Sequence, residues 1–384
     1  MYLDNNASTA TDPEIVDVLH RVTSSTSVAN PHSSEHAYGW RADDLIQESK
    51  EIVADFLNSL PEEIYFTSGA TESNNLAIIG LAMSAHDKKV RRNEIIVSPT
   101  EHKCVLNSAN FVTHIFNEFK IIEAPINKNG IVDIQKLERL ISDKTLLVSI
   151  MAVNNEIGVI QPLKEIGTLC KKQGAIFHTD AAQGAYIDLD VVENNIDMLS
   201  LSGHKVYAPK GIGVLYVNDD ISTRPSPIIY GGNQQNGLRS GTLSPALCIS
   251  MAKALEKISK KRVDESVHLS KMREIFLQTL KGNNIDYVIN GCMKNRHPGN
   301  LNIQITGIDS STLITRLQPN LAISTGSACN SGAVQGSYVL KEIGLSTKAI
   351  ESSIRIGFGR FNTMDESVRA AKMISDEINR LKTV

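Results

Sequence analysis

The chain has 384 residues, of which 41% are hydrophobic and 21% are charged, a composition typical of a globular protein with enough core for two or three domains. Its formal net charge of -3 predicts no general affinity for nucleic acid or for an anionic membrane. The N-terminus shows no targeting segment and no apolar run is long enough to span a bilayer, so we expect a cytoplasmic protein.

The cysteines exclude two further classes of protein. There are five of them, far apart in the sequence and without a Cys-x-x-Cys pair. Neither a disulfide framework nor a metal site is therefore expected, and a reducing compartment fits best. Each cysteine is, by default, a small buried hydrophobe.

Helices and strands alternate along the first part of the chain. A capping residue and a proline, Asp12 and Pro13, begin the first helix, which has an apolar face. The next predicted helices cover about 39–57, 76–85, 103–112, 133–141 and 162–173, and the predicted strands cover 64–67, 94–98, 120–124, 145–151, 175–178, 197–201 and 213–217. Because these strands are continuously apolar, they predict an α/β fold with a mostly parallel sheet that is covered on both faces.

Polar residues follow the predicted strands where each strand ends, which is where ligands bind in open α/β sheets. These stretches are 68–75, 100–102, 154–158, 178–183 and 202–205. The first of them joins a strand to a helix and either presents backbone N–H groups to an anion or is a simple turn.

The second part of the chain predicts another domain. A glycine-rich loop at 230–242 precedes a long helical stretch at 244–281, and we place the boundary inside that stretch. Residues 15–250 are expected to form a large domain, and residues 1–14 and 251–384 a smaller α+β domain. The strands expected in the smaller domain cover 286–289, 301–305, 322–324 and 353–356, and a helix at 365–381 closes the chain.

Lys205 follows an apolar strand and lies beside Ser202 and His204. It is either an ordinary surface lysine or an amine that forms a Schiff base with a carbonyl cofactor, for which pyridoxal phosphate is the candidate. The pyridine nitrogen of that cofactor needs a carboxylate, and Asp180 ends the preceding strand. Backbone N–H groups around Ala70 and the side chains of Ser202 and His204 offer donors to its phosphate.

A series of motifs along the chain resembles a known family. The motifs cover residues 2–7, 30–31, 67–75, 100–102, 154–158, 178–183, 202–205, 239–242, 324–331 and 353–355. Together they resemble the fold type I pyridoxal-phosphate enzymes of aminotransferase class V and, more narrowly, the group I cysteine desulfurases of the NifS/IscS type. The resemblance covers almost the whole chain and implies the pyridoxal-phosphate-dependent transferase fold.

The resemblance also implies roles for individual residues. Lys205 would bind the cofactor and move the Cα proton of the substrate, Asp180 would pair with the pyridinium nitrogen, and His102 would stack on the ring and act as an acid or base. Further contacts would come from Gln183 to the ring hydroxyl, from Ala70, Thr71, Ser202 and His204 to the phosphate, from Asn155 to cofactor and substrate, and from Arg355 to the substrate carboxylate. In the implied homodimer, Thr242 would complete the phosphate site from the partner subunit.

Cys329 differs from the other cysteines. It lies among small residues and glycines, which predict a mobile loop over about 324–336. A mobile thiolate is what sulfur transfer needs. By resemblance, L-cysteine would yield L-alanine and a persulfide on Cys329, which would pass to an acceptor protein. Cys104 follows His102 by two residues, and we expect it to be structural rather than part of the site.

Two departures from the family pattern bear on the acceptor. Asn330 stands where many relatives have threonine, and the chain ends soon after its last predicted helix, where housekeeping members carry a segment that touches the iron–sulfur scaffold. An acceptor in tRNA thiolation or DNA phosphorothioation is therefore weighed beside iron–sulfur assembly. The alternatives to a desulfurase are a selenocysteine lyase, another class-V enzyme, and an inactive binding protein.

Overall fold

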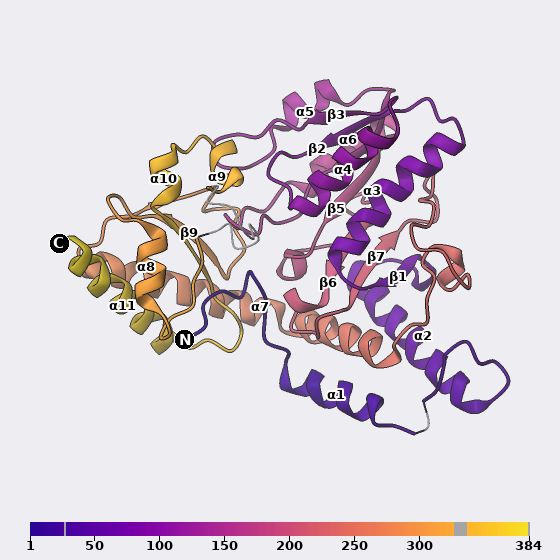
Figure 1. Ribbon diagram of the computed structural model, residues 1–384, viewed down its shortest axis with the longest axis horizontal. Coiled ribbons are helices and arrows are strands. Elements are labelled where there is room, and N and C mark those ends of the chain that lie inside the picture. The colour runs from indigo at the N-terminus through magenta and orange to yellow at the C-terminus, as the bar shows by residue number, and fades with distance from the viewer. Residues whose placement is uncertain (27, 326–335, 383–384) are drawn as a thin grey trace.

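The computed structural model describes residues 1–26, 28–325 and 336–382 (Figure 1). The strands of the larger sheet are β1 (Ile64–Thr67), β2 (Glu94–Val97), β3 (Lys120–Glu123), β4 (Thr145–Ser149), β5 (Ile176–Asp180), β6 (Met198–Ser202) and β7 (Gly213–Val217). The strands of the smaller sheet are β8 (Val288–Ile289), β9 (Asn300–Gln304) and β10 (Ser353–Gly357). Within the described residues, these strands lie in the orders β1-β7-β6-β5-β4-β2-β3 and β10-β9-β8.

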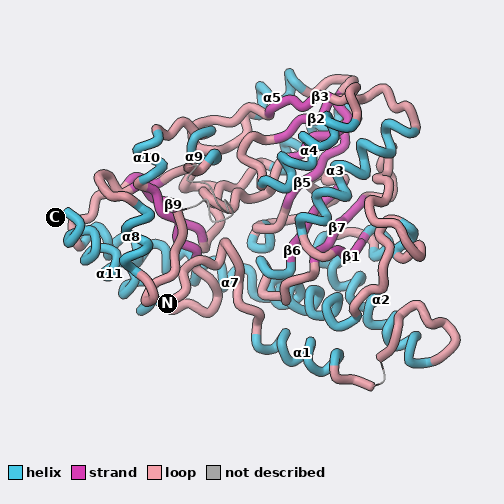
Figure 2. The backbone as a smooth tube through the Cα atoms, in the orientation of Figure 1, coloured by secondary structure: helices cyan, strands magenta, loops and turns pink. Residues whose placement is uncertain are grey.

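The helices lie around the two sheets (Figure 2). They are α1 (Pro13–Thr23), α2 (Ala37–Leu57), α3 (Ala70–Asp87), α4 (Lys103–Ile115), α5 (Ile134–Leu140), α6 (Leu163–Gln173), α7 (Pro245–Gly282), α8 (Ser310–Leu317), α9 (Tyr338–Glu342), α10 (Thr347–Glu351) and α11 (Met364–Lys382). None of those described is long and apolar enough to cross a membrane.

The larger sheet is mostly parallel, which confirms the predicted fold class. Only β7 runs against its neighbours β1 and β6, whereas the other adjacent strands run in the same direction. Every residue of β4, β5 and β6 is buried. Strands buried on both faces are rich in apolar residues, and that is why the sequence located them.

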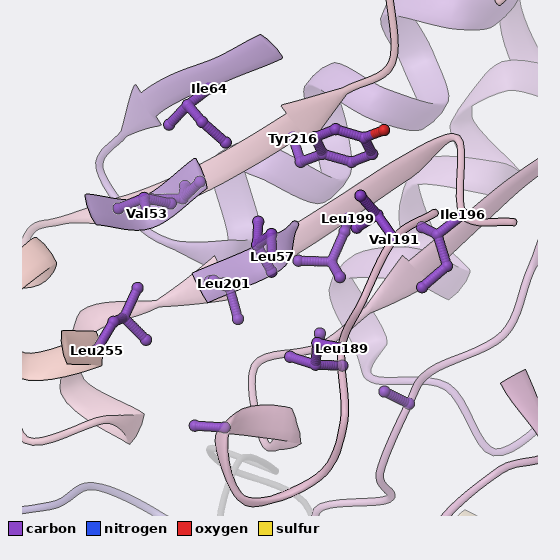
Figure 3. Packing of buried hydrophobic residues seen from close by; sticks show 14 of the residues in the cluster. Val53, Leu57, Ile64, Leu189, Val191, Ile196, Leu199, Leu201, Tyr216 and Leu255 are labelled. Atoms are coloured by element: carbon purple, nitrogen blue, oxygen red, sulfur yellow. The ribbon is translucent and has the colours of Figure 1, made fainter. Parts of the chain in front are cut away.

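The two faces of this sheet pack on different helices because successive side chains of a strand point to opposite sides. On β2, Ile95 and Val97 join α3 and α4 in one apolar cluster, whereas Ile96 joins α2, α5, α6 and α7 in another. Figure 3 shows part of the second cluster, in which Val53 and Leu57 of α2 face the sheet residues Leu201 and Tyr216.

The smaller sheet packs on α8, α11 and the second half of α7. Its strands β9 and β10 are antiparallel, and Leu3 of the N-terminal segment lies in the same apolar cluster. The long helix α7 contributes to the cores beside both sheets. The division into domains at residue 250 stays a prediction, since this helix runs through that position.

Two local expectations were inaccurate. The polar run 68–75 is not a turn throughout, because α3 already begins at Ala70. Serine, threonine and asparagine favour loops in a sequence, but they also suit the first turn of a helix. The strand expected at 322–324 is replaced by single bridges, from Ala322 to Tyr2 and from Ser324 to Arg355, whose partners lie far away in the chain.

Candidate active site

A cavity of 460 Å³ lies at the carboxyl ends of β1, β5 and β6. It brings together most of the residues singled out in the sequence, which come from segments up to 285 positions apart. Its lining includes Ala70, Thr71, His102, Asn155, Asp180, Gln183, Ser202, His204, Lys205 and Arg355. The convergence of a lysine, a histidine, a buried aspartate and an arginine on one concave space marks a candidate active site.

One wall of the cavity is the N-terminus of α3. Gly69 precedes this helix with a φ of 154° and offers no capping side chain to the first N–H groups, those of Ala70 and Thr71. Such N–H groups, together with the helix dipole, favour an anion. Glu72, in the same turn, is held by an ion pair of 2.7 Å with Arg239. Burial alone would raise the pKa of Glu72, but hydrogen bonds from Arg239 and Ser68 outweigh it and lower the pKa.

Lys205 lies just beyond β6, and the N-terminal segment positions its amine. The Nζ atom donates hydrogen bonds to the carbonyl oxygens of Asn6, at 2.6 Å, and Ala7, at 2.8 Å. Gln183 binds the same segment, since its Nε2 donates to the Asn6 carbonyl at 2.8 Å. Residues almost 200 positions away in the sequence therefore orient the lysine.

Asp180 ends β5 and is 4% exposed. Its Oδ2 accepts a hydrogen bond of 2.8 Å from Asn74, and its Oδ1 accepts one of 2.9 Å from the backbone N–H of Ala182. Hydrogen-bond donors of this kind offset the cost of burying a polar side chain. His178, on the same strand, lies between the hydroxyls of Ser149 and Ser200, and burial lowers its pKa to about 3. It is neutral at physiological pH.

Two histidines line the cavity. His102 precedes α4, and its Nδ1 accepts a hydrogen bond of 3.2 Å from the backbone N–H of Cys104. His204 lies 3.3 Å from the Ser8 hydroxyl. Burial, followed by the charges of Lys205 and Lys210, lowers the pKa of His204 to about 4. His204 is therefore neutral at physiological pH.

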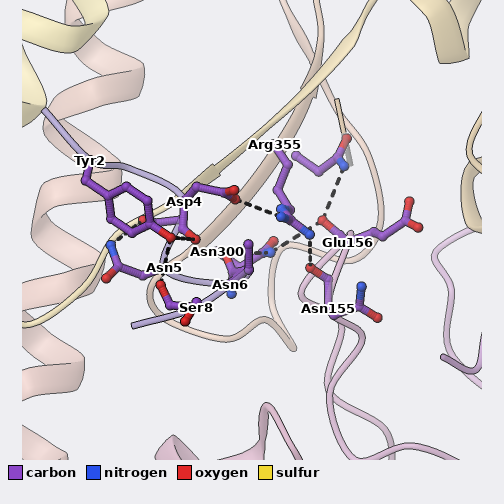
Figure 4. Close-up of polar contacts among 12 residues, drawn as sticks. Tyr2, Asp4, Asn5, Asn6, Ser8, Asn155, Glu156, Asn300 and Arg355 are labelled. Atoms are coloured by element: carbon purple, nitrogen blue, oxygen red, sulfur yellow. Dashed lines mark hydrogen bonds and ion pairs between the residues drawn. The ribbon is translucent and has the colours of Figure 1, made fainter. Parts of the chain in front are cut away.

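Arg355 enters the cavity from β10 (Figure 4). It is only 2% exposed, and its Nη2 pairs with Asp4 Oδ1 at 2.7 Å while its Nη1 donates to the Asn155 carbonyl at 3.0 Å. Its Nε has no hydrogen-bond partner among the described residues. A buried guanidinium with an unused donor fits the carboxylate of a small ligand.

The sequence missed some residues of this site. Cys104, which we expected to be structural, is part of the cavity wall, and Asn74 binds Asp180 from the second turn of α3. Asn74 lies within the polar run 68–75 that the sequence indicated, but nothing in that run distinguishes it from its neighbours. Cys104 lies in the first turn of α4, where a cysteine resembles a core residue. Thr242 is exposed and not part of the lining, and Cys329 lies outside the described residues.

Residues 1–369 match the model of the aminotransferase class-V family. The chain belongs to this family. The class-V chain is 42% identical to the cysteine desulfurase IscS of Rickettsia bellii over 384 residues, which cover 100% of this chain and 92% of the relative. The recognised resemblance to the NifS/IscS type is thereby confirmed.

Solved structures agree with this assignment. A NifS-like protein superposes with a TM-score of 0.90 at 30% identity and covers 99% of each chain. A structure described as SspA in complex with cysteine superposes with a TM-score of 0.82 at 36% identity, covering 94% of this chain and 99% of the other. Both the sequence and the fold of the class-V chain are therefore those of the desulfurase group.

Proposed function

We propose that this chain is a cysteine desulfurase that takes sulfur from L-cysteine and releases L-alanine. The observation that carries the proposal is the single cavity shared by Lys205, Asp180 and Arg355, at the uncapped N-terminus of α3. An aldehyde cofactor with a phosphate requires an amine, a buried carboxylate and a site for the phosphate. An amino-acid substrate requires a second anion site for its carboxylate.

The residues present fit pyridoxal phosphate, the cofactor of this family. When bound, it supplies an electron sink for the negative charge that develops at the substrate Cα. Asp180 would keep the ring nitrogen protonated, and Gln183 and His102 would contact the ring. The N–H groups of Ala70 and Thr71 would bind the phosphate, together with the side chains of Ser202 and His204.

The chain's own groups then handle the substrate. Arg355 and Asn155 would hold the carboxylate of L-cysteine, which places the Cα proton within reach of Lys205. The amine of Lys205 would remove that proton and later return one to the product. The N-terminal segment supports this role because its carbonyl groups fix the position of the amine.

Cys329 is the proposed sulfur acceptor within the chain. Its thiolate would attack the sulfur of the bound substrate, so that an S–S bond forms while the C–S bond breaks and its electron pair goes to carbon. That carbon takes up a proton and leaves in alanine, and Cys329 keeps the sulfur as a persulfide. In support, Ser324 and Arg355 share two backbone hydrogen bonds, so the chain leads toward Cys329 from beside the carboxylate site.

The final acceptor of the sulfur is proposed to be another protein. The class-V match is compatible with iron–sulfur assembly, tRNA thiolation and DNA phosphorothioation, and the proposal extends to all three. Capture of partners by the persulfide-loaded enzyme, followed by their identification, distinguishes among these pathways. The same proposal includes a homodimer in which Thr242 completes the phosphate site of the partner subunit.

The test incubates the purified protein with L-cysteine and a thiol reductant, and it measures alanine and sulfide. The wild type is expected to be yellow and to release both products. Lys205→Ala should lose the visible absorption band of the bound cofactor and the activity, whereas Cys329→Ser should keep the absorption band and lose the activity. Cys292→Ser is the matched control and should behave as wild type, because Cys292 lies outside the cavity lining.

Two results would contradict the proposal. One is full alanine release from L-cysteine by Cys329→Ser. The other is release of alanine from L-selenocysteine but not from L-cysteine, which would make the chain a selenocysteine lyase.

A further inference from the structure

Asn74 lies between two groups that the proposed mechanism treats separately. It is on the second turn of α3 and is fully buried. Its Nδ2 donates to Asp180 Oδ2 at 2.8 Å and lies 3.1 Å from the sulfur of Cys104. The two N–H bonds of one amide group thus serve the carboxylate and the thiol at the same time.

The orientation of this amide is fixed by its charged neighbour. Turning it over would bring Oδ1 against the Asp180 carboxylate, which has no hydrogen to donate. In the observed orientation Oδ1 is buried and has no hydrogen-bond partner among the described residues. Leaving a buried acceptor unpaired costs stability, so the bonds on the nitrogen side determine how the amide lies.

Cys104 continues the connection to His102. The backbone N–H of Cys104 donates to His102 Nδ1 at 3.2 Å, and its sulfur lies 3.0 Å from the same nitrogen. Because Nδ1 accepts, the neutral imidazole carries its proton on Nε2. The thiol then accepts from Asn74 and donates to Nδ1, whose single lone pair it shares with the backbone N–H of Cys104.

We propose that Asn74 and Cys104 are positioning residues that join Asp180 to His102 and hold both as one unit against the cofactor ring. The proposal rests on the proposed function, because Asp180 and His102 are its ring contacts. In this account Cys104 is neither a core hydrophobe nor a second sulfur carrier. Its thiol fixes the imidazole and supports the amide that holds the carboxylate.

The test compares variants of the full-length holoenzyme by the absorption spectrum of bound pyridoxal phosphate and by its dissociation constant in equilibrium dialysis. Asn74→Ala is expected to weaken cofactor binding about tenfold or more, because a hydrogen bond to a charged group is lost, and to shift the absorption band. Cys104→Ala should show a smaller loss, and Cys104→Ser, which keeps a donor and an acceptor, should restore binding. Asn75→Ala is the control, because the Asn75 side chain lies on the same helix but donates to the Thr71 carbonyl instead of to Asp180.

A connected pair has a further signature. If the two residues act together, the double variant should lose little more cofactor affinity than Asn74→Ala alone, because the connection between Asp180 and His102 is already broken. Additive losses, or an Asn74→Ala protein that behaves like Asn75→Ala, would overturn the proposal. If Asn74→Ala does not fold, the comparison of Cys104→Ala with Cys104→Ser decides, and equal binding by both would also overturn it.

These measurements distinguish the positioning role of Asn74 and Cys104, here called the Asn74–Cys104 bridge, from the proposed function. A wild type that binds the cofactor but releases no alanine from L-cysteine would refute the desulfurase and leave the bridge measurable by cofactor binding. A working desulfurase in which the Asn74 and Cys104 variants bind the cofactor normally would refute only the bridge.

Discussion

Arg355 illustrates how single residues define this site. Moving a guanidinium out of water is unfavourable unless it is paired, and Asp4 and the Asn155 carbonyl supply its partners. The sequence indicated Arg355 through its apolar neighbours on β10. It did not indicate Asp4, because the two residues are 351 positions apart and the pairing exists only in the folded chain.

Arg355→Lys should raise the KM for L-cysteine about tenfold or more and change kcat less. Lysine keeps the positive charge but loses the planar fork that binds a carboxylate through two parallel bonds. Steady-state alanine release over a range of L-cysteine concentrations measures both constants. Arg369→Lys, an exposed residue of α11, is the matched control, and an unchanged KM in Arg355→Lys would contradict the proposed carboxylate site.

Glu156 gives a prediction for pH. Burial raises the pKa of this carboxyl from 4.5 to about 7, although the hydroxyl of Ser337 and the charge of Arg355 oppose the shift. The folded chain therefore binds a proton more tightly than the unfolded chain between these two values, so this group's contribution to the free energy of unfolding falls as the pH rises from 4.5 to 7. Glu156→Gln removes that dependence.

The variant should thus gain stability relative to wild type when the pH is raised from 5 to 8. Urea unfolding of both proteins at the two pH values measures the difference. Glu123→Gln, at an exposed position of β3, should show no such trend. A stability difference between Glu156→Gln and wild type that stays constant over this range would contradict the assignment.

At the scale of elements, the junction of β1 and α3 places the backbone N–H groups that are proposed to bind the phosphate. Gly213 of β7 pairs with Thr67 of β1, and a Cβ at Gly213 would lie 2.5 Å from the Cα of Gly69. The close approach of two backbones therefore brings the N-terminus of α3 to the edge of the sheet. Both glycines are visible in the sequence, but only the strand order shows that they touch.

Gly213→Ala should lower the free energy of unfolding by roughly 1–3 kcal/mol and weaken cofactor binding, because an added methyl group has only backbone atoms to displace. Thermal unfolding and equilibrium dialysis measure the two effects. Gly282→Ala, where an added Cβ meets nothing within 4 Å, is the control. A Gly213→Ala protein with wild-type stability and affinity would show that this approach is not needed.

The elements themselves were largely predictable. Strands such as β2 and β7 consist mostly of apolar residues, and helices such as α1 begin with a cap and a proline that the sequence shows. The segment at 322–324 was wrongly predicted to be a strand, since it makes only single bridges, to Tyr2 in the N-terminal segment and to Arg355 in β10. A local sequence pattern predicts a strand only when the segment pairs with other strands in a regular sheet.

At the scale of the whole molecule, the N-terminal segment links the two sheets. Leu3 lies in the apolar cluster beside the smaller sheet, and the carbonyl groups of Asn6 and Ala7 bind Lys205 beside the larger one. The sequence predicted most of the polar residues that line the cavity, but not that this segment orients the lysine. Such contacts depend on chain topology and leave no local pattern.

The proposed homodimer predicts complementation between subunits. A Thr242→Ala chain should bind the cofactor more weakly, and a Lys205→Ala chain should be inactive. In a mixed dimer, the subunit with an intact lysine would receive an intact Thr242 from its partner, so one normal site should form. Activity of the mixture at limiting cofactor, after co-expression, measures this, and light scattering should give twice the chain mass of 42.0 kDa. Activity no higher than that of the Thr242→Ala protein would place this threonine within its own subunit.

The most direct test of the central claim is the mass of the peptide that contains Cys329 after the holoenzyme reacts with L-cysteine in the absence of a reductant. We expect this peptide to gain the mass of one sulfur atom, with one alanine released for each sulfur bound. The gain should disappear after treatment with a thiol reductant and should be absent from Lys205→Ala. Release of alanine while Cys329 remains unmodified would contradict the account.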